Sequence, residues 1–392
     1  MPKVRKGVEV SIAIADAVAQ ADTDVIAAYP ITPQTHIVEH LSEIVANGHL
    51  DAEYVPVESE HSAMSVCCGS AAVGARTFTS TSSQGLALMS EIFFIAGAMR
   101  LPIVMALANR SLSSPLSIWN DHSDTMMVRD AGWIHIFVEN GQECYDNIFC
   151  SYRMAEDPAV LFPVAMNLDG FILTHMIEPV EYEDDETIRK YLPPFTMVNP
   201  LHPDNPVSMG CFGMPDIYTE TQMNREQGIR NAYSKILQAW DEWGTLTGRY
   251  YHPVETYRAD DAEYCIVTMG SYGETAMEVV DTLRGEGENV GVVKIRLWRP
   301  FPFDEIRAAL LGKKCLIVID RAISFGGPGG PVASELRSAL YRKEGAPTIV
   351  SYVAGLAGRD VSRKDLRNII LEGKAKALRG DTDGFTLYGL RG

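Results

Sequence analysis

Short apolar runs alternate with helical patterns over residues 8–170 of this chain. The runs typical of strands are Asp24–Tyr29, Ala52–Val57, Arg76–Ser80, Pro102–Leu107, Ile134–Val138 and Ala159–Met166. Between them, apolar positions recur at helical spacing around residues 9–20, 35–46, 59–74, 85–99 and 141–156. A regular alternation of strands and helices predicts a doubly wound α/β domain with a parallel sheet.

The pattern changes after residue 170 and then returns. Residues 171–260 are broken by prolines and support one amphipathic helix, at about 224–246, so we interpret them as a connector that wraps the first domain. A second α/β series occupies residues 261–392. Its expected strands are Tyr264–Met269, Val290–Leu297, Cys315–Asp320 and Thr348–Val353, and its expected helices are 272–285, 303–312 and 331–342.

Composition narrows the class of protein. Hydrophobic residues make up 46% of the 392 residues, which indicates a globular chain. The net charge of −17 predicts an acidic surface that repels nucleic acid and anionic lipid. We expect no membrane association, since neither a signal-like start nor a run of about 18 apolar residues occurs. A cytoplasmic location follows as an expectation.

The cysteines argue against a metal centre in this chain. All 7 are scattered, without any C-x-x-C spacing, whereas a zinc site or an iron–sulfur cluster needs about four closely spaced ligands. We therefore expect reduced thiols and no metal ligands here. Any redox metal centre would lie on another polypeptide.

Polar loops follow the first strands of the predicted sheet. Tyr29–Pro33 places Thr32 between two prolines, Val57–His61 carries Glu60, and Thr79–Gly85 is rich in hydroxyl groups. Because parallel strands bring their carboxyl ends to one edge of a sheet, we expect these loops to form half of a cofactor site.

Each loop also has an ordinary structural explanation. Thr32 is a rigid hydrogen-bond donor to a ligand, or it belongs to a common strand-to-helix turn. Glu60 is a carboxylate tuned by an apolar wall, or one attracted by the helix dipole. The hydroxyl groups of 79–85 bind a phosphate or a heterocycle, or they satisfy the backbone of their own turn.

Arg110 follows the strand Pro102–Leu107. Its planar guanidinium suits a substrate carboxylate, and the alternative is a salt bridge to Asp121 or Asp124. His122 lies between these two acids, but a single histidine makes a weak candidate for a metal site.

Two other motifs do not fit the phosphate sites that they suggest. The glycine-rich run at 326–330 lacks both the G-x-G-x-x-G spacing and a Walker lysine, so we expect a tight connection. Asp169-Gly170 followed by Asn199 lacks the first glycine of the pattern that holds a magnesium-bound pyrophosphate, and we reject that interpretation.

Ordered motifs along the whole chain resemble the alpha subunit of the 2-oxoacid:ferredoxin oxidoreductases, most closely the multi-subunit pyruvate:ferredoxin oxidoreductases (pyruvate synthases). The segments that carry the resemblance are Tyr29–Pro33, Val57–Ala63, Thr81–Met89, Asn109–Pro115, Leu297–Pro302 and Ile323–Gly326. The resemblance implies a thiamine-diphosphate pyrimidine-binding domain at 1–170, the connector 171–260, and a domain at 261–392 that is similar to the C-terminal domain of transketolase.

The resemblance also implies roles for particular residues. Glu60 matches the glutamate that contacts N1′ of the aminopyrimidine and assists proton transfer there. Thr32 and Arg110 match residues that hold the keto and carboxylate oxygens of the substrate, and Pro30 and Ile31 would line the cofactor. The family's magnesium-bound diphosphate and [4Fe-4S] clusters belong to partner subunits.

The resemblance thus implies an incomplete catalytic subunit. Its assembly, with diphosphate-binding, iron–sulfur and gamma-type subunits, would convert pyruvate and coenzyme A to acetyl-CoA and carbon dioxide, reducing ferredoxin, or catalyse the reverse. A branched-chain 2-oxoacid or a 2-oxoglutarate enzyme is an alternative, because Arg110 would bind the carboxylate of any 2-oxoacid. A non-catalytic scaffold that retains the fold is an alternative of another class.

Overall fold

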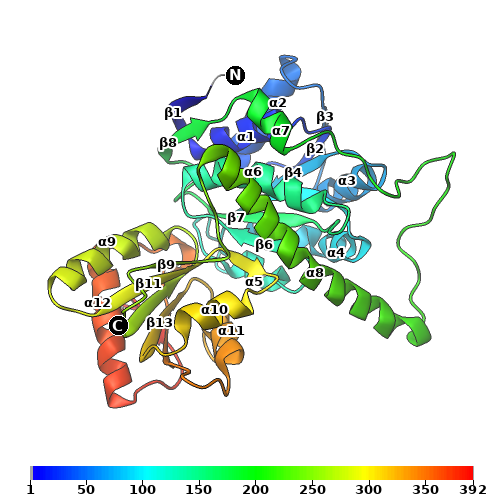
Figure 1. Cartoon of the computed structure of the whole chain (residues 1–392). Coiled ribbons are helices and arrows are strands. Elements are labelled where there is room, and N and C mark those ends of the chain that lie inside the picture. Colours follow the sequence, from blue (N-terminus) through cyan, green and yellow to red (C-terminus); the bar gives the residue numbers. More distant parts are fainter. Residues whose placement is uncertain (1–2, 392) are drawn as a thin grey trace.

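Continuous apolar runs become the inner strands of two separate sheets in the computed structural model, which describes residues 3–391 (Figure 1). The first sheet has seven strands in the order β12-β6-β7-β5-β4-β2-β3. They are β2 (Val25–Ala28), β3 (Glu53–Pro56), β4 (Thr77–Thr81), β5 (Ile103–Asn109), β6 (Ile134–Phe137), β7 (Val164–Asp169) and β12 (Leu297–Arg299). All neighbours pair in parallel except β12, which is antiparallel to β6.

Helices cover both faces of this sheet. They are α1 (Val10–Gln20), α2 (Thr35–Ala46), α3 (Glu60–Ala72), α4 (Ser83–Met99), α5 (Ser123–Val128) and α6 (Gly141–Ala155). One apolar core joins the sheet to α1, α2 and α6, and another joins it to α3, α4 and α5. The predicted doubly wound α/β fold is confirmed, since β5 is buried along its whole length between these layers.

The second sheet has six strands in the order β15-β14-β13-β10-β11-β9. They are β9 (Val254–Tyr257), β10 (Tyr264–Thr268), β11 (Val290–Ile295), β13 (Cys315–Asp320), β14 (Thr348–Val353) and β15 (Thr386–Leu387). Its helices are α9 (Tyr272–Gly285), α10 (Phe303–Leu310), α11 (Pro331–Leu340), α12 (Arg363–Arg379) and the 3-10 turn η1 (Leu356–Gly358). Sequence analysis did not predict α12, although Ser362 and Asp365 form a capping box at its start.

The predicted strand Val290–Leu297 is wrong in one respect, because it is two strands on two different sheets. Residues 290–295 form β11 in the second sheet, whereas 297–299 form β12 at the edge of the first. The chain turns at Arg296, whose buried guanidinium pairs with Glu143 and Glu255. The second half of the chain therefore contributes a strand to the first sheet.

Residues 171–260 contain more structure than the predicted helix. β8 (Ile177–Tyr182) pairs antiparallel with β1 (Val4–Glu9), and α7 (Asp185–Tyr191) follows. The helix α8 (Pro215–Thr247) begins earlier than the predicted 224, because proline is favourable in the first turn of a helix. Its C-terminal half packs on α6 and joins the first core.

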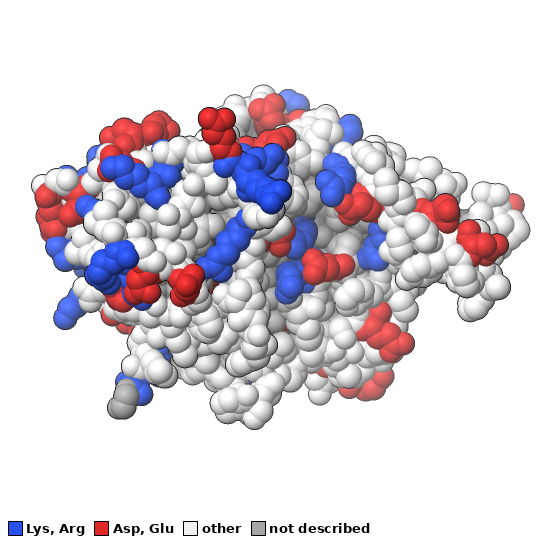
Figure 2. Space-filling model, turned by 90° about the horizontal axis from the view of Figure 1, so that it is seen from below, with Lys and Arg blue, Asp and Glu red and all other residues white. Residues whose placement is uncertain are grey.

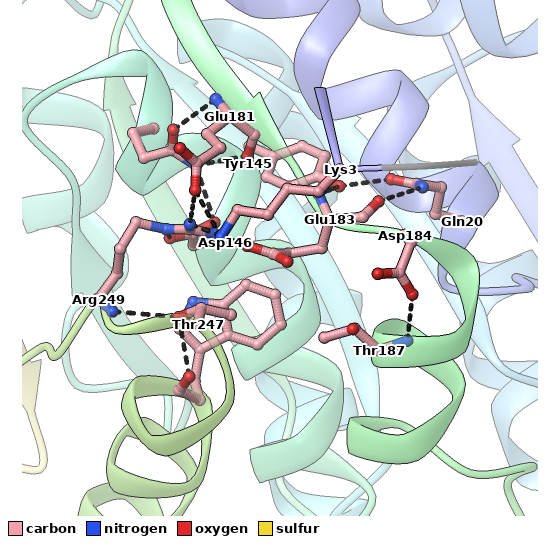
Figure 3. Close-up of polar contacts among 12 residues, drawn as sticks. Lys3, Gln20, Tyr145, Asp146, Glu181, Glu183, Asp184, Thr187, Thr247 and Arg249 are labelled. Atoms are coloured by element: carbon pink, nitrogen blue, oxygen red, sulfur yellow. Dashed lines mark hydrogen bonds and ion pairs between the residues drawn. The ribbon is translucent and has the colours of Figure 1, made fainter. Parts of the chain in front are cut away.

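A partly buried ion cluster fixes the chain where α8 ends (Figure 3). The Arg249 guanidinium donates to both carboxylate oxygens of Asp146, at 2.6 and 2.9 Å, and to Glu181 and Glu183. Lys3 pairs with the same two glutamates. Asp146 is fully buried, so this pairing offsets the cost of removing its charge from water.

The segment before α8 and the first turns of that helix project away from the rest of the molecule (Figure 1). Residues 191–224 contain no lysine or arginine, and the projection in Figure 2 carries acidic patches on a largely uncharged surface. Phe212, in this segment, is 84% exposed. Across residues 3–391, no helix has both the length and the apolar content that a membrane span requires.

His135 is an unusual buried group in the first sheet. It lies on β6 opposite Ala165, it is 0% exposed, and neither ring nitrogen has a hydrogen-bond partner within the part of the chain that the structure describes. Burial, assisted by the positive charge of Arg299, lowers the pKa of His135 to about 3. The imidazole is therefore neutral in the folded chain throughout the physiological pH range.

We expect acid to destabilise the fold through His135. Between pH 6.5 and pH 3, His135 binds a proton in the unfolded chain but not in the folded chain. The free energy of unfolding therefore falls as the pH falls. Between pH 7 and pH 5, the free energy of unfolding should fall by about 2 kcal/mol more in the wild type than in His135→Phe. Urea unfolding at both pH values measures this difference, and parallel losses in the two proteins would contradict it.

Candidate active site

Polar loops leave four neighbouring strands of the first sheet at one edge. β5, β4, β2 and β3 are consecutive in the sheet and pair in parallel, so the loops after them lie side by side. Thr32, Glu60 and Arg110 all lie on these loops or directly after them. This arrangement places the predicted residues at the edge where open α/β sheets bind ligands.

Glu60 is the first residue of α3. Its helix is capped by Ser59, whose hydroxyl oxygen accepts from the Ser62 backbone N–H at 3.2 Å, and the dipole of the helix favours a carboxylate at this position. Glu60 is only 7% exposed. Even so, no residue between 3 and 391 donates a hydrogen bond to its carboxylate.

Glu58 behaves differently from Glu60 although the two are close in sequence. It is exposed, and its carboxylate accepts a hydrogen bond from the Ser62 hydroxyl, which lowers the pKa of Glu58. The hydrogen-bonding need of Glu58 is thus met locally, by a residue in the first turn of α3. The two carboxylates have separate environments, one satisfied within the chain and one not.

The start of α4 closes over Glu60. A Cβ atom added to Gly85 would lie 2.7 Å from Glu60 Oε1 and 2.4 Å from Thr81 Oγ1, so only glycine allows this approach. The hydroxyls of Thr79, Thr81 and Ser82 are buried and have no partner in the described chain. Buried polar atoms without partners are uncommon and are expected where a ligand or ordered water binds.

Arg110 and Thr32 are brought together, although not through the expected atoms. The Arg110 guanidinium donates to the backbone oxygens of Thr32 and Ser117, each at 2.8 Å. It forms no ion pair with Asp121 or Asp124, so the predicted alternative of a salt bridge is wrong. Burial lowers the pKa of Arg110, and the nearby charge of Asp124 opposes this only partly.

Pro30 and Ile31 occupy the loop that carries Thr32. The backbone of this loop forms a turn in which Gln34 donates to the oxygens of Ile31 and Tyr29. Pro30 and Thr32 are exposed and Ile31 is half-buried. These side chains are therefore available to a bound molecule or to another subunit.

Sequence analysis did not identify Asp124 as more than a possible partner of Arg110. Its carboxylate is fully buried and accepts from the backbone N–H groups of Ser83 and Arg110, from the Asn109 amide and from the Thr125 N–H. Burial raises the pKa of Asp124 to about 7 despite these four donors.

The segment that follows Arg110 is also held by the second half of the chain. His122 Nε2 and Asn120 Nδ2 contact Asp169 Oδ1, at 2.8 and 3.1 Å, and Arg321 pairs with the other oxygen of Asp169. Asp169 is thus a structural carboxylate, in agreement with the rejection of a pyrophosphate motif. Residues 3–391 contain no group of three or more His, Cys, Asp or Glu side chains arranged to hold a metal ion.

These observations fit one end of a heterocyclic cofactor. An unpartnered, buried carboxylate can accept a proton or hydrogen bond from a ring nitrogen, and unpartnered hydroxyls can bind its polar edges. Gly85 leaves room beside the carboxylate where any larger residue would clash. Arg110, with no hydrogen bond from Nη2 to any residue of the described chain, can reach the carboxylate of a second small molecule.

Comparison with known families agrees with this site. Residues 16–240 match the family described as "Pyruvate flavodoxin/ferredoxin oxidoreductase, thiamine diP-bdg". Residues 262–366 match "Pyruvate:ferredoxin oxidoreductase core domain II". The two matches agree with the two sheets. The first covers every strand except β12 of the sheet that carries Glu60, and the second covers the inner strands of the second sheet.

Two curated relatives span nearly the whole chain. "Pyruvate synthase subunit PorA" of Methanocaldococcus jannaschii is 48% identical over 91% of this chain and 92% of its own length. "Ketoisovalerate oxidoreductase subunit VorA" of Pyrococcus furiosus is 41% identical over 97% of this chain and 96% of its own length.

Two solved structures share the fold. The 2-oxoglutarate:ferredoxin oxidoreductase from Magnetococcus marinus superposes with a TM-score of 0.68 at 21% identity, covering 95% of this chain and 65% of that chain. A split-gene transketolase gives a TM-score of 0.55 at 11% identity, covering 94% of this chain and 99% of that chain. With the family match over most of its length and relatives above 40% identity, the chain belongs to the pyruvate flavodoxin/ferredoxin oxidoreductase family, as a PorA-type subunit with a thiamine-diphosphate-binding domain.

Proposed function

We propose that this chain is the alpha subunit of a cytoplasmic enzyme that oxidatively decarboxylates pyruvate with coenzyme A and reduces ferredoxin, or catalyses the reverse reaction. The observation that carries the proposal is the Glu60 carboxylate, which receives no hydrogen bond within the described chain and lies against Gly85, at the sheet edge that also carries the Arg110–Thr32 pair. The PorA relatives support pyruvate as the substrate.

Each residue of the site would have a separate chemical role. Glu60 would hold a proton at N1′ of the aminopyrimidine, and Pro30 and Ile31 would line that ring. Arg110 would bind the substrate carboxylate and Thr32 the keto oxygen. Thiamine diphosphate, when bound, supplies the nucleophilic carbon and stores the electrons that carbon dioxide leaves behind.

The remaining parts of the enzyme would come from other subunits. We propose that one subunit binds the diphosphate and its Mg²⁺, that iron–sulfur subunits hold the [4Fe-4S] clusters, and that a gamma-type subunit completes the assembly. Within this chain we propose a pyrimidine-binding domain at 1–170, a connecting segment at 171–260 and a transketolase-like domain at 261–392. The strand β12 then passes from the last of these to the first.

Anaerobic purification of the native complex tests the assignment directly. We expect the chain to co-elute with subunits that bring iron and thiamine diphosphate, and we expect the complex to reduce ferredoxin with pyruvate and coenzyme A. Iron, thiamine and subunit stoichiometry are measured on the same fraction. A chain that elutes alone, without either cofactor, would support the non-catalytic scaffold instead.

A branched-chain 2-oxoacid is the second candidate substrate, because the VorA relative is 41% identical over 97% of this chain. Arg110 would bind the carboxylate of either acid and cannot choose between them. Comparing kcat/KM for pyruvate, 2-ketoisovalerate and 2-oxoglutarate in the purified complex decides among the three.

Glu60→Gln should reduce turnover by about 10²–10⁴-fold, because glutamine keeps the shape of the side chain but cannot exchange a proton. Subunit assembly and thermal stability should stay unchanged. Glu58→Gln is the matched control, since Glu58 is exposed and satisfied by Ser62, and it should retain activity. Full turnover in Glu60→Gln would remove Glu60 from the mechanism.

Arg110→Lys should raise the KM for pyruvate by about 10- to 100-fold with a smaller effect on kcat, because lysine cannot bind a carboxylate with two parallel hydrogen bonds. Arg230→Lys, on the exposed surface of α8, serves as the control and should leave the KM unchanged. The role of Arg110 is refuted by a wild-type KM in the variant.

A further inference from the structure

The Asp124 carboxylate links two loops of the candidate site, which are also joined by the hydrogen bond from the Ser83 hydroxyl to the Ser111 oxygen. Its Oδ2 atom accepts from the backbone N–H of Ser83, after β4, and from the backbone N–H of Arg110, after β5, both at 3.0 Å. Its Oδ1 atom accepts from Asn109 Nδ2 at 3.0 Å and from the Thr125 N–H at 2.8 Å. One oxygen atom thus contacts the backbone of both loops.

This arrangement is more than a helix cap. Asp124 is in the first turn of the short helix α5, where a carboxylate is favourable in any case. A cap would bind the N–H groups of its own helix, but only the Thr125 N–H belongs to α5. The other three donors come from the ends of β4 and β5, which are remote in sequence.

The Ser83 backbone, which Asp124 binds, has a strained conformation. Ser83 has a φ of +46°, in the left-handed region that residues other than glycine rarely adopt. Such a conformation persists only where the surroundings hold it. Here the Asp124 carboxylate binds the Ser83 N–H, and the Ser83 hydroxyl donates to the Ser111 oxygen at 2.6 Å.

Each loop carries one half of the proposed chemistry. Two residues after Ser83, Gly85 lies against the Glu60 carboxylate. On the other loop, the Arg110 side chain reaches the Thr32 oxygen from a backbone that Asp124 holds. The position of the guanidinium relative to Glu60 therefore depends on the bonds that meet at Asp124.

We propose that Asp124 is a positioning residue that sets the Arg110 guanidinium at a fixed place relative to the Glu60 side of the site. The proposal rests on the proposed function, since it takes Arg110 to bind the substrate carboxylate. It assigns Asp124 no contact with substrate or cofactor.

The test uses the assembled complex containing Asp124→Asn. Asparagine fills the same space, but its NH₂ group cannot accept, so two of the four donors lose their partner in either orientation of the amide. The loss of one buried hydrogen bond should displace the Arg110 guanidinium. The KM for pyruvate should therefore rise by about tenfold or more. An unchanged KM in a well-folded Asp124→Asn complex overturns the proposal.

A matched control separates positioning from stability. Asp320 is also fully buried and also accepts from two backbone N–H groups, those of Val332 and Ala333, at the start of α11. Asp320→Asn should lower the thermal stability without raising the KM. Equal KM increases in Asp320→Asn and Asp124→Asn would mean that the effect is general destabilisation, and would overturn the proposal.

A double-mutant cycle with Arg110→Lys gives the sharpest readout. If Asp124 acts through Arg110, the KM of Arg110→Lys/Asp124→Asn should stay within about twofold of that of Arg110→Lys alone. A KM in the double variant that equals the product of the two single effects would show that Asp124 acts by another route.

Should Asp124→Asn fail to assemble, hydrogen exchange in the wild-type complex decides. The Ser83 and Arg110 amides should exchange slowly and together, and rapid exchange at Arg110 alone overturns the proposal.

The outcomes also separate this proposal from the proposed function. A wild-type complex that turns over none of the three 2-oxoacids contradicts the function itself. A wild-type complex that is active, with a normal KM in Asp124→Asn, contradicts only the role of Asp124.

Discussion

The buried carboxylate of Asp169 holds the two sheets and the candidate site in one arrangement. It lies at the end of β7, and it pairs with the buried guanidinium of Arg321, which follows β13 of the second sheet. Burial opposes the ionisation of Asp169, but the charges of Arg321 and His122 and the hydroxyl of Ser271 hold its pKa well below the usual range. A buried charge is tolerated only with such pairing, and loss of one partner from such a pair typically costs about 3–5 kcal/mol. This charge is therefore one of the links that fix the relative position of the two sheets, together with strand β12 and the ion pairs of Arg296.

This constraint extends to the loop beside Arg110. The Arg321 backbone oxygen accepts from the His122 N–H at 2.8 Å, and the Asn120 oxygen accepts from the Gly358 N–H at 2.5 Å. Gly358 is also close-packed, since a Cβ atom there would lie 2.6 Å from Trp119 Cβ. The second half of the chain supplies none of the residues proposed to touch cofactor or substrate. Its contribution to the site is structural, because Arg321 and Gly358 hold the segment that follows Arg110 through Asn120 and His122.

Sequence alone predicted the inner strands well and the links between distant segments poorly. β13 and β14 were predicted with their observed bounds, because a strand buried on both faces is a continuous apolar run. β12 was missed because Leu297–Arg299 continues the apolar run of β11, and only the ion pairs of Arg296 with Glu143 and Glu255 show where the chain changes sheet. Thr32, Glu60 and Arg110 were predicted as site residues because motifs mark them. The structural roles of Asp124 and Asp169 were not predicted, because the donors that satisfy their carboxylates come from remote segments of the chain.

The contrast between satisfied and unsatisfied polar groups gives the strongest physical indication of function. Asp124 and Asp169 are fully buried and each accepts several hydrogen bonds, so the chain itself offsets the cost of their burial. Glu60 is nearly as buried and receives no hydrogen bond from residues 3–391, and the neighbouring Thr81 and Ser82 hydroxyls share that condition. The Glu60 carboxylate is therefore open to a molecule that binds at this edge of the sheet. The proposed role of Glu60 depends on this difference, because a carboxylate already occupied by donors of its own chain would not be free for a cofactor.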